Sequence, residues 1–220
     1  MSDSINIAFQ NLYRQIVEKI SLDNVYADEK IPRVPLGHAN IKNCKVLLNR
    51  RDLLLQMPQN SICAELGVDR GEFTQQIIDI NRPNKVHLVD TWGDERYNQT
   101  LYESILTKFQ KEISMSKIVI HRELSVEAVN YFKDDYFDWV YIDTDHSFET
   151  TFNELVFYSK KIKKGGFIAG HDYTMGNWKN NYRYGVIEAV HKFCVEFNWE
   201  IIFLTAETIE DRSFALRQIT

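Results

Sequence analysis

The stretch EIIFLTAETIEDRSFALRQI (Glu200–Ile219) decides between the folds open to this chain. It contains two strand-like runs, EIIFL and SFALRQI, which only the eight residues TAETIEDR separate. A connection between two parallel strands needs a dozen or more residues and usually contains a helix. The two runs are therefore predicted to form an antiparallel hairpin at the end of the sequence.

Upstream of this hairpin, the chain from Ser61 onward alternates short β-branched runs with segments of helical periodicity. Strands are predicted near residues 61–66, 85–90, 117–121, 137–143, 166–170 and 199–204, and helices near 71–80, 97–113, 125–133, 147–162 and 185–197. Such alternation predicts a doubly wound α/β fold, in which helices cover both faces of a parallel sheet. With the hairpin, we expect a seven-stranded, mostly parallel sheet with one antiparallel strand.

The first 57 residues follow a different pattern. Apolar residues at helical spacing predict an amphipathic helix over residues 5–20, and KVLLNRRDLLLQM (Lys45–Met57) predicts a second. The segment IPRVPLGHAN between them contains two prolines and a glycine, which exclude a regular helix. We expect a helical cap or lid over residues 1–57 and an α/β domain over residues 58–220. His38 lies in this lid and could reach a substrate, and two subunits could pair through the N-terminal helices.

Composition excludes several classes of protein. The chain has 220 residues, 44% hydrophobic and 26% charged, which is typical of one globular domain. The net charge is −5 and the basic residues are dispersed, so neither a nucleic acid nor an anionic membrane is an expected partner. Cys44, Cys63 and Cys194 are too widely spaced for a zinc site or a disulfide framework. Without a signal-peptide pattern or a run of 18 apolar residues, a soluble cytoplasmic protein is expected.

Ionisable side chains gather where two of the predicted strands end. The stretches WVYIDTDHSF (139–148) and GGFIAGHDY (165–173) together supply Asp143, Asp145, His146, His171 and Asp172. Ligands of an open α/β sheet bind outside the carboxyl ends of its strands, so these side chains are expected to share one site. In the alternative interpretation, Asp145 and His146 cap the helix at 147–162, while His171 and Asp172 begin a turn.

A glycine loop and an acidic residue precede this site. AELGVDRGEFTQQI (64–77) places Gly67 and Gly71 at a turn from strand to helix, where a missing Cβ allows positive φ and close approach of a ligand. Asp90 ends the next strand 23 residues after Gly67, about where dinucleotide folds place the carboxylate that binds ribose hydroxyls. Trp92 would either lie against an adenine or cover the sheet, and the sequence does not distinguish the two.

This loop and VHLVDTW (86–92) resemble the cofactor-binding half of the class I S-adenosylmethionine-dependent methyltransferases. YIDTDHSFE, KKGGFIAGHDY and GVIEAVHKF are similar to a bacterial subgroup that includes sugar and antibiotic-tailoring O-methyltransferases. The resemblance covers about residues 45–220 and implies S-adenosyl-L-methionine as the cofactor. It implies that Glu65, the acidic residue at the head of the loop, binds the cofactor, while Asp69 replaces the usual middle glycine. The turn at Ser125 would border the adenine, although Ser125 is also expected to be a helix N-cap.

The resemblance also implies a metal site. In the metal-dependent relatives one carboxylate follows the fourth strand, and an acidic pair, or an acid with an amide, follows the fifth. Asp143 and Asp172 match that pattern and His171 departs from it. We therefore expect Asp143, which would also face the cofactor's sulfonium methyl group, to hold one Mg²⁺ or Mn²⁺ together with His171 and Asp172. His146 is the expected general base.

Proton affinities favour metal assistance if the acceptor is a hydroxyl. An alcohol resembles water, with a pKa near 15.7, and free imidazole has a pKa near 6.5, so full proton transfer is uphill by about 12 kcal/mol. A divalent cation removes much of that cost. An amine or a phenol would need less help, and His146 or His171 could then act alone as the base.

The sequence thus predicts a methyltransferase that acts on a small acceptor, a hydroxyl of a sugar or secondary metabolite. One alternative is a nicotinamide-dependent Rossmann oxidoreductase, which the missing G-x-G-x-x-G pattern and the terminal hairpin disfavour. The other is a non-catalytic cofactor-binding module, which the acidic residues at both strand ends disfavour.

Overall fold

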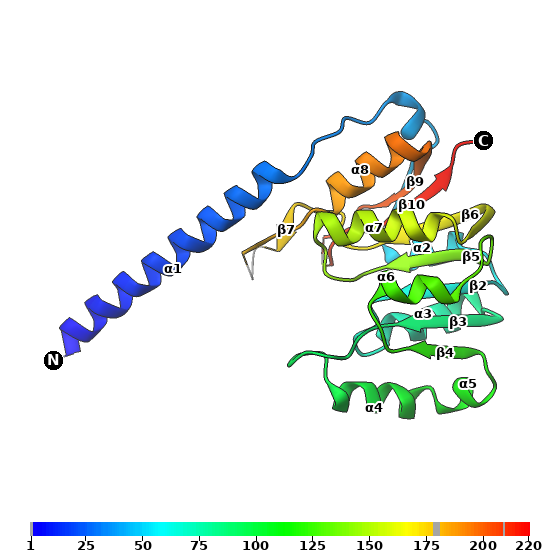
Figure 1. Ribbon diagram of the computed structural model, residues 1–220, viewed down its shortest axis with the longest axis horizontal. Helices are drawn as coiled ribbons and strands as arrows, with labels where there is room; N and C mark the ends of the chain where they lie inside the picture. Colours follow the sequence, from blue (N-terminus) through cyan, green and yellow to red (C-terminus); the bar gives the residue numbers. More distant parts are fainter. Residues whose placement is uncertain (1, 178–180, 209) are drawn as a thin grey trace.

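The computed structural model describes residues 2–177, 181–208 and 210–220, and an eight-stranded sheet forms its centre (Figure 1). The strand order is β1-β9-β10-β6-β5-β2-β3-β4, and β10 runs antiparallel to both of its neighbours. The strands are β1 (Lys45–Leu47), β2 (Ile62–Leu66), β3 (Lys85–Val89), β4 (Ile118–His121), β5 (Phe137–Ile142), β6 (Ile162–Gly170), β9 (Trp199–Thr205) and β10 (Phe214–Gln218). The predicted α/β fold and terminal hairpin are confirmed.

Helices cover both faces of this sheet. One face packs against α2 (Arg50–Gln56), α3 (Glu72–Asn81), α4 (Gln99–Lys108) and α5 (Gln110–Ser114), and the other against α6 (Ser125–Ala128), η2 (Val129–Tyr131), α7 (Phe148–Ser159) and α8 (Val186–Phe197). Successive side chains of a strand point to opposite faces. In β5, Val140 and Ile142 therefore join the core under α7 and α8, whereas Trp139 and Tyr141 join the core under α3.

Residues 45–57 differ from the single helix that was expected there. Lys45–Leu47 form β1, which pairs in parallel with the edge of β9 and adds an eighth strand to the sheet. The helix begins only at Arg50, because the Asn49 side chain caps it by accepting a hydrogen bond from the backbone N–H of Asp52 at 2.9 Å. An unpaired strand edge offers backbone partners that the local helical pattern of the sequence does not reveal.

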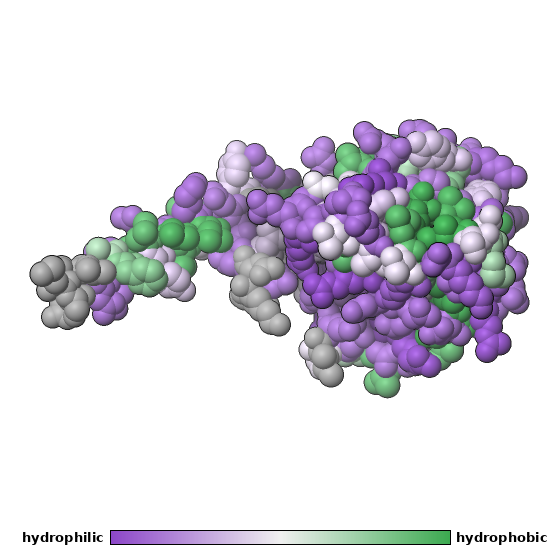
Figure 2. Space-filling view, turned by 90° about the horizontal axis from the view of Figure 1, so that it is seen from below, coloured by the Kyte–Doolittle hydropathy of each residue, from purple (hydrophilic) through white to green (hydrophobic). Residues whose placement is uncertain are grey.

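The helix α1 (Ser2–Lys30) is longer than the predicted 5–20 and projects away from the sheet (Figure 1). Its C-terminal part contacts the hairpin of β7 (Gly176–Asn177) and β8 (Tyr182–Arg183), where Asp28 pairs with Arg183 at 2.8 Å. Figure 2 shows apolar side chains along the projecting part, where Phe9, Leu12 and Ile16 are all exposed. Pairing of two subunits through this helix stays a prediction.

The segment after α1 returns to the body of the protein. It contains the short helix η1 (His38–Asn40), whose buried Asn40 donates to the carbonyl oxygens of Cys194 and Trp199 at 3.1 and 2.8 Å. Trp199 begins β9, so exposed His38 lies near the amino end of that strand and away from the carboxyl ends where the site was expected. Across the described residues, no helix combines the length and the apolar character needed to cross a membrane.

Candidate active site

The carboxyl ends of four adjacent strands, β3, β2, β5 and β6, meet at one edge of the sheet. Backbone pairing continues past the strand ends, since the Asp143 N–H donates to Leu66 at 2.8 Å and the His171 N–H donates to Ile142 at 3.0 Å. Each of the four turns holds a non-glycine residue with positive φ, and these are Asp69, Trp92, His146 and Asp172. Such residues cost about 1–3 kcal/mol each and cluster at functional sites.

Gly67 and Gly71 of the glycine loop are required by the chain's own packing. Gly67 has φ +84°, and a Cβ there would lie 1.8 Å from the carbonyl oxygen of Asp143. Gly71 has φ +64°, and its Cβ would lie 2.6 Å from a ring carbon of Phe109. The sequence had suggested that a ligand approaches these positions. The structure instead shows that the missing Cβ of Gly67 lets the loop pack against the backbone of Asp143, a predicted metal ligand.

Asp90 holds the glycine loop in place. Its Oδ2 accepts from the backbone N–H groups of Val68 and Asp69 at 2.8 and 3.1 Å, and its Oδ1 accepts from that of Trp92 at 3.0 Å. A carboxylate has about four acceptor positions, so these three bonds leave one for a further donor such as a ribose hydroxyl. Asp90 can therefore contact a nucleoside while it orders the loop.

Trp92 and Ser125 have structural partners that the sequence did not show. Trp92 is fully buried and donates from Nε1 to the carbonyl of Asp69 at 3.3 Å, which favours the second alternative, that it covers the sheet. Ser125 is not the predicted N-cap, because Leu124 occupies that position without a side-chain cap. The Ser125 hydroxyl instead donates to the carboxylate of Glu154. Burial raises the pKa of Glu154 to about 7, although the Ser125 hydroxyl opposes the shift.

Glu65 lies at the end of β2, beneath the glycine loop, and is almost fully buried. The hydroxyl of Thr74 in α3 donates to its Oε2. Burial raises the pKa of Glu65 to about 8, and this hydrogen bond opposes the shift. Glu65 is therefore mostly protonated at neutral pH.

The four side chains Asp143, His146, His171 and Asp172 meet in one group, which we name the carboxylate–histidine cluster. His146 Nε2 lies 3.3 Å from Asp143 Oδ1 and 2.9 Å from Asp172 Oδ2. His171 Nδ1 lies 3.3 Å from Asp172 Oδ2 and 3.7 Å from Asp143 Oδ2. The predicted convergence of the two strand ends is present in the structure.

The donors of this cluster suit a divalent cation. One ligand atom from each of Asp143, His146 and Asp172 can be chosen so that all three lie within 4.8 Å of one another. This set contains His146, whereas the sequence had suggested His171 as the histidine ligand. His171 lies deeper, and its Nε2 is buried without a hydrogen-bond partner among the described residues. Carboxylate oxygens with one imidazole fit Mg²⁺, Mn²⁺ or a softer ion.

The carboxylates also determine the charge of the imidazoles. Burial alone would lower the pKa of His146, but hydrogen bonds and charges from Asp143 and Asp172 outweigh burial and raise it to about 10. The pKa of His171 is raised against burial by the same two carboxylates. Burial would raise the pKa of Asp172, but the hydrogen bonds from both imidazoles hold it well below its usual range. An imidazolium accepts no proton, so the general-base role predicted for His146 would require this proton to leave first, and that role stays a prediction.

Sequence reasoning missed Arg50, Glu210 and Asp211 at this site. The Arg50 guanidinium lies 3.6 Å from Asp143 Oδ2 and 3.1 Å from Glu210 Oε2. Burial and the nearby Asp172 raise the pKa of Asp211. Arg50 belongs to a helix expected in the lid, and the two acids lie in the loop of the terminal hairpin. The predicted terminal hairpin was the signal that could have located Glu210 and Asp211, because its loop follows the carboxyl end of β9 on the same edge of the sheet.

Asp145 fits the structural alternative considered for it. Its carboxylate accepts from the Ser147 N–H at 2.9 Å and from the Thr150 hydroxyl at 2.8 Å. Ser147 itself is the N-cap of α7 and accepts from the Thr150 N–H at 3.2 Å. Asp145 therefore shapes the start of α7.

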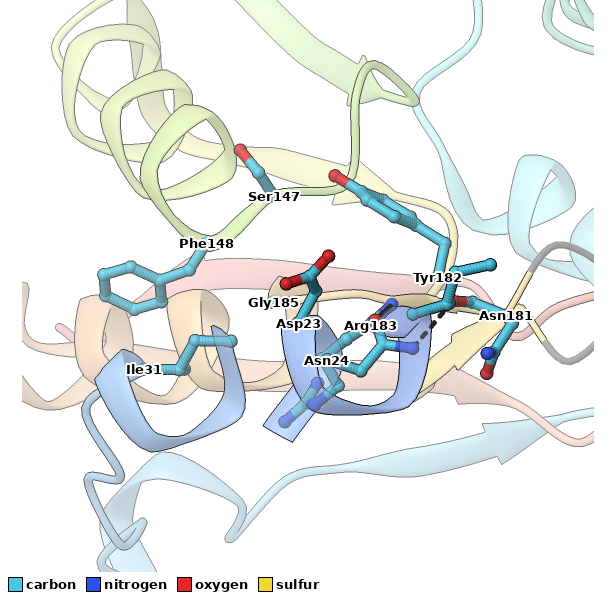
Figure 3. A pocket seen from close by; sticks show the side chains of 10 residues that line it. Asp23, Asn24, Ile31, Ser147, Phe148, Asn181, Tyr182, Arg183 and Gly185 are labelled. Carbon is cyan, nitrogen blue, oxygen red and sulfur yellow. Dashed lines mark hydrogen bonds between the residues drawn. The ribbon is translucent and has the colours of Figure 1, made fainter. Parts of the chain in front are cut away.

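A pocket of about 470 Å³ opens next to the cluster, between α1, the β7–β8 hairpin and the start of α7 (Figure 3). We name it the α1 pocket, and its lining includes Asp23, Asn24, Ser147, Phe148, Tyr182 and Arg183. Ser147 directly follows His146, whose carbonyl accepts from the N–H of Gly185, another lining residue, at 2.8 Å. The pocket and the cluster therefore share the turn at residues 146–147.

Comparison with known proteins agrees with this arrangement. A family model described as "Methyltransferase domain" matches residues 64–173, which is half of the chain and includes both the glycine loop and the cluster. A search of curated proteins found no significant sequence match.

Solved structures share the fold at low sequence identity. The N-methyltransferase NodS from Bradyrhizobium japonicum has a TM-score of 0.55 at 14% identity, over 78% of this chain and 95% of that one. A SAM-dependent methyltransferase from Aquifex aeolicus has a TM-score of 0.55 at 9% identity, over 77% and 89%. The B. subtilis tRNA methyltransferase TrmK has a TM-score of 0.56 at 11% identity, over 79% and 67%. These similarities establish the fold and leave the acceptor open.

Proposed function

The chain belongs to the family described as a methyltransferase domain, and from that premise we propose that it transfers the methyl group of S-adenosyl-L-methionine to a hydroxyl of a small polar acceptor. The ordered glycine loop and the remaining acceptor position of Asp90 support a nucleoside cofactor at the ends of β2 and β3. Both the family match and the antiparallel β9–β10 pair count against a nicotinamide-dependent oxidoreductase.

The observation that carries this proposal is the carboxylate–histidine cluster next to the glycine loop. We infer that Asp143, His146 and Asp172 would hold a divalent cation, because their ligand atoms already lie within 4.8 Å of one another. Such a cation supplies positive charge that favours loss of the proton from an acceptor hydroxyl.

The residues of the cluster divide into accessible and deep pairs. The side chains of Asp143 and His146 are 26% and 24% exposed, so an acceptor can reach both. Those of Asp172 and His171 are 7% and 12% exposed, so Asp172 would hold the cation from the buried side, and the role of His171 is to orient Asp172. His146 Nε2 carries a proton between the two carboxylates and gives it up when that atom serves as a ligand. Of the cluster's two carboxylates, Asp143 belongs to the residue on whose backbone Gly67 of the glycine loop packs.

The α1 pocket is the proposed acceptor site, and α1 is the proposed lid. A small acceptor is favoured over nucleic acid, since the chain carries a net charge of −5 and several carboxylates surround the reaction edge. One of the similar structures is a tRNA methyltransferase, so RNA binding should be measured directly.

Calorimetric titration tests the cofactor and the cation separately. We expect wild-type protein to bind S-adenosylhomocysteine and Mn²⁺. Asp172→Asn should lose at least about tenfold in Mn²⁺ affinity, the loss expected for one charged ligand, and keep its affinity for S-adenosylhomocysteine. Asp145→Asn is the matched control, because Asp145 binds the start of α7, and it should retain both.

Two results would overturn the proposal. Equal Mn²⁺ affinity in wild type and Asp172→Asn would show that the cation does not bind at this site. Binding of NAD without binding of S-adenosylhomocysteine would contradict the proposed methyltransferase reaction. Once an acceptor is known, excess chelator should abolish activity and added Mg²⁺ or Mn²⁺ should restore it.

A further inference from the structure

Paired charged side chains surround the α1 pocket. Arg183 lines the pocket, but its guanidinium already pairs with Asp28 at 2.8 Å and with the carboxylate of Glu188. Glu188 Oε2 is buried and has no hydrogen-bond partner among the described residues. Asp28 also pairs with Arg33 at 2.6 Å, so two guanidinium groups face two carboxylates in the wall behind the pocket, and Glu188 Oε2 is the acceptor left over there.

Asp23 adds a third carboxylate to this environment. Figure 3 shows its side chain pointing into the space between Ser147, Phe148 and Tyr182. Its ion pair with Lys19 is 3.5 Å long and the two side chains are 67% and 78% exposed, so water screens the pair and it neutralises Asp23 only weakly.

The neighbouring reaction edge adds further carboxylates. Across the two sites, seven carboxylates face the three guanidinium groups of Arg33, Arg50 and Arg183, and they are Asp23, Asp28, Asp143, Asp172, Glu188, Glu210 and Asp211. Counting Lys19 and both imidazoles of the cluster as cations still leaves one carboxylate in excess. A net charge of one sign raises the local concentration of ligands of the opposite sign.

Two aromatic rings complete the pocket. Tyr182 is 48% exposed and contacts Tyr184 edge to face, with their ring centroids 5.7 Å apart. Phe148 is held by stacking on Phe152, with a centroid distance of 5.7 Å. Both rings line the space into which Asp23 points (Figure 3). A carboxylate beside aromatic faces is a favourable environment for an organic cation.

Building on the proposed function, we propose that the α1 pocket recognises a protonated amine, so that the acceptor is a small polyol that carries an amino group, such as an amino sugar. The amine would lie beside Asp23 and the rings of Tyr182 and Phe148, while a hydroxyl of the same molecule extends past Ser147 toward His146. An anionic acceptor would be repelled by the carboxylates, and a neutral sugar would leave Asp23 with only its solvent-screened pair with Lys19.

Two sugars that differ in one group test this proposal. Full-length protein saturated with S-adenosylhomocysteine is titrated with glucosamine and with glucose, at a slightly acidic pH at which the amine is protonated. We expect glucosamine to bind about tenfold more tightly, the ratio expected for one charge-assisted contact. Asp23→Asn should reduce this preference to about twofold or less, whereas Asp79→Asn, an exposed carboxylate on α3 that bonds Gln75, should preserve it.

The aromatic contribution is tested at Tyr182. Tyr182→Phe should retain the preference for glucosamine because the ring remains, and Tyr182→Leu should weaken glucosamine binding. Equal affinity for the two sugars, or an unchanged preference in Asp23→Asn, would overturn this inference alone, provided that S-adenosylhomocysteine binds. Failure of S-adenosylhomocysteine to bind would instead overturn the proposed function.

Discussion

Replacing Gly67 with alanine tests how tightly the cofactor loop packs on the carboxylate–histidine cluster. A Cβ at this position would lie 1.8 Å from the carbonyl oxygen and 2.6 Å from the carbonyl carbon of Asp143, so the two turns must separate. The positive φ costs about 1–2 kcal/mol for a residue with a side chain. Forcing the backbones apart adds about 1–3 kcal/mol, and weakening the Asp143 N–H to Leu66 hydrogen bond adds about 1 kcal/mol.

Gly67→Ala should therefore destabilise the protein by about 3–6 kcal/mol, a large part of the 5–15 kcal/mol typical of a folded domain. Gly165→Ala is the matched control. Gly165 has a similar φ of +81°, but no described heavy atom lies within 4 Å of the position that a Cβ would take there, so only the cost of the backbone conformation applies. We expect this control to lose about 1–2 kcal/mol.

Urea unfolding followed by circular dichroism measures both variants. The two free energies of unfolding should differ by about 2–4 kcal/mol, with similar dependence on urea concentration. Gly67→Ala should also weaken Mn²⁺ binding, because Asp143 moves, while Gly165→Ala should not. If the two variants lose the same stability within about 0.5 kcal/mol, the contact between the loop and Asp143 is not as close as the structure shows.

Three further outcomes are expected. Burial raises the pKa of Glu154 from 4.5 to about 7, so its contribution to stability is complete below about pH 4.5 and is lost as the pH rises through about 7. The unfolding free energy of Glu154→Gln should therefore fall less between about pH 5 and pH 8 than that of wild type. Parallel curves for the two proteins would contradict this. Asp90→Ala should weaken S-adenosylhomocysteine binding by about 1.5–3 kcal/mol in calorimetry, because the loop and the nucleoside lose one acceptor, and unchanged affinity would exclude Asp90 from the site. Removing residues 1–30 should leave S-adenosylhomocysteine binding intact and abolish turnover of an identified acceptor, so full turnover would show that α1 is not a lid.

The position of that truncation shows how local patterns mislead. The sequence predicted a lid over residues 1–57. Residues 1–44 precede the second helix predicted in that lid, so they were the natural segment to remove. Asn40, however, is buried and bonds two carbonyl groups of the α8–β9 corner, and Lys45–Leu47 pair with β9. Both interactions join residues more than 150 positions apart, which no pattern within the segment can reveal.

Within the site, the sequence placed Asp143, His146, His171 and Asp172 at adjacent strand ends because strand termination and sheet order follow from local periodicity. It could not decide which imidazole lies between the carboxylates. That choice depends on the turn conformations, in which His146 has φ +63° and Asp172 has φ +56°. Likewise, Ser125 begins a helix as a cap would, but the buried carboxylate of Glu154 on α7 takes its hydroxyl.

The sequence alone thus determined the α/β alternation, the terminal hairpin and the residues that end β5 and β6, since these depend on side-chain period and connection length. Only the tertiary structure brought Arg50 and Glu210 to Asp143, fitted Gly67 against the Asp143 backbone and placed Asp23 beside Tyr182. The physical reason is the range of the interactions. Periodicity acts over neighbouring residues, whereas charge pairing and close packing join segments that are adjacent only after the chain has folded.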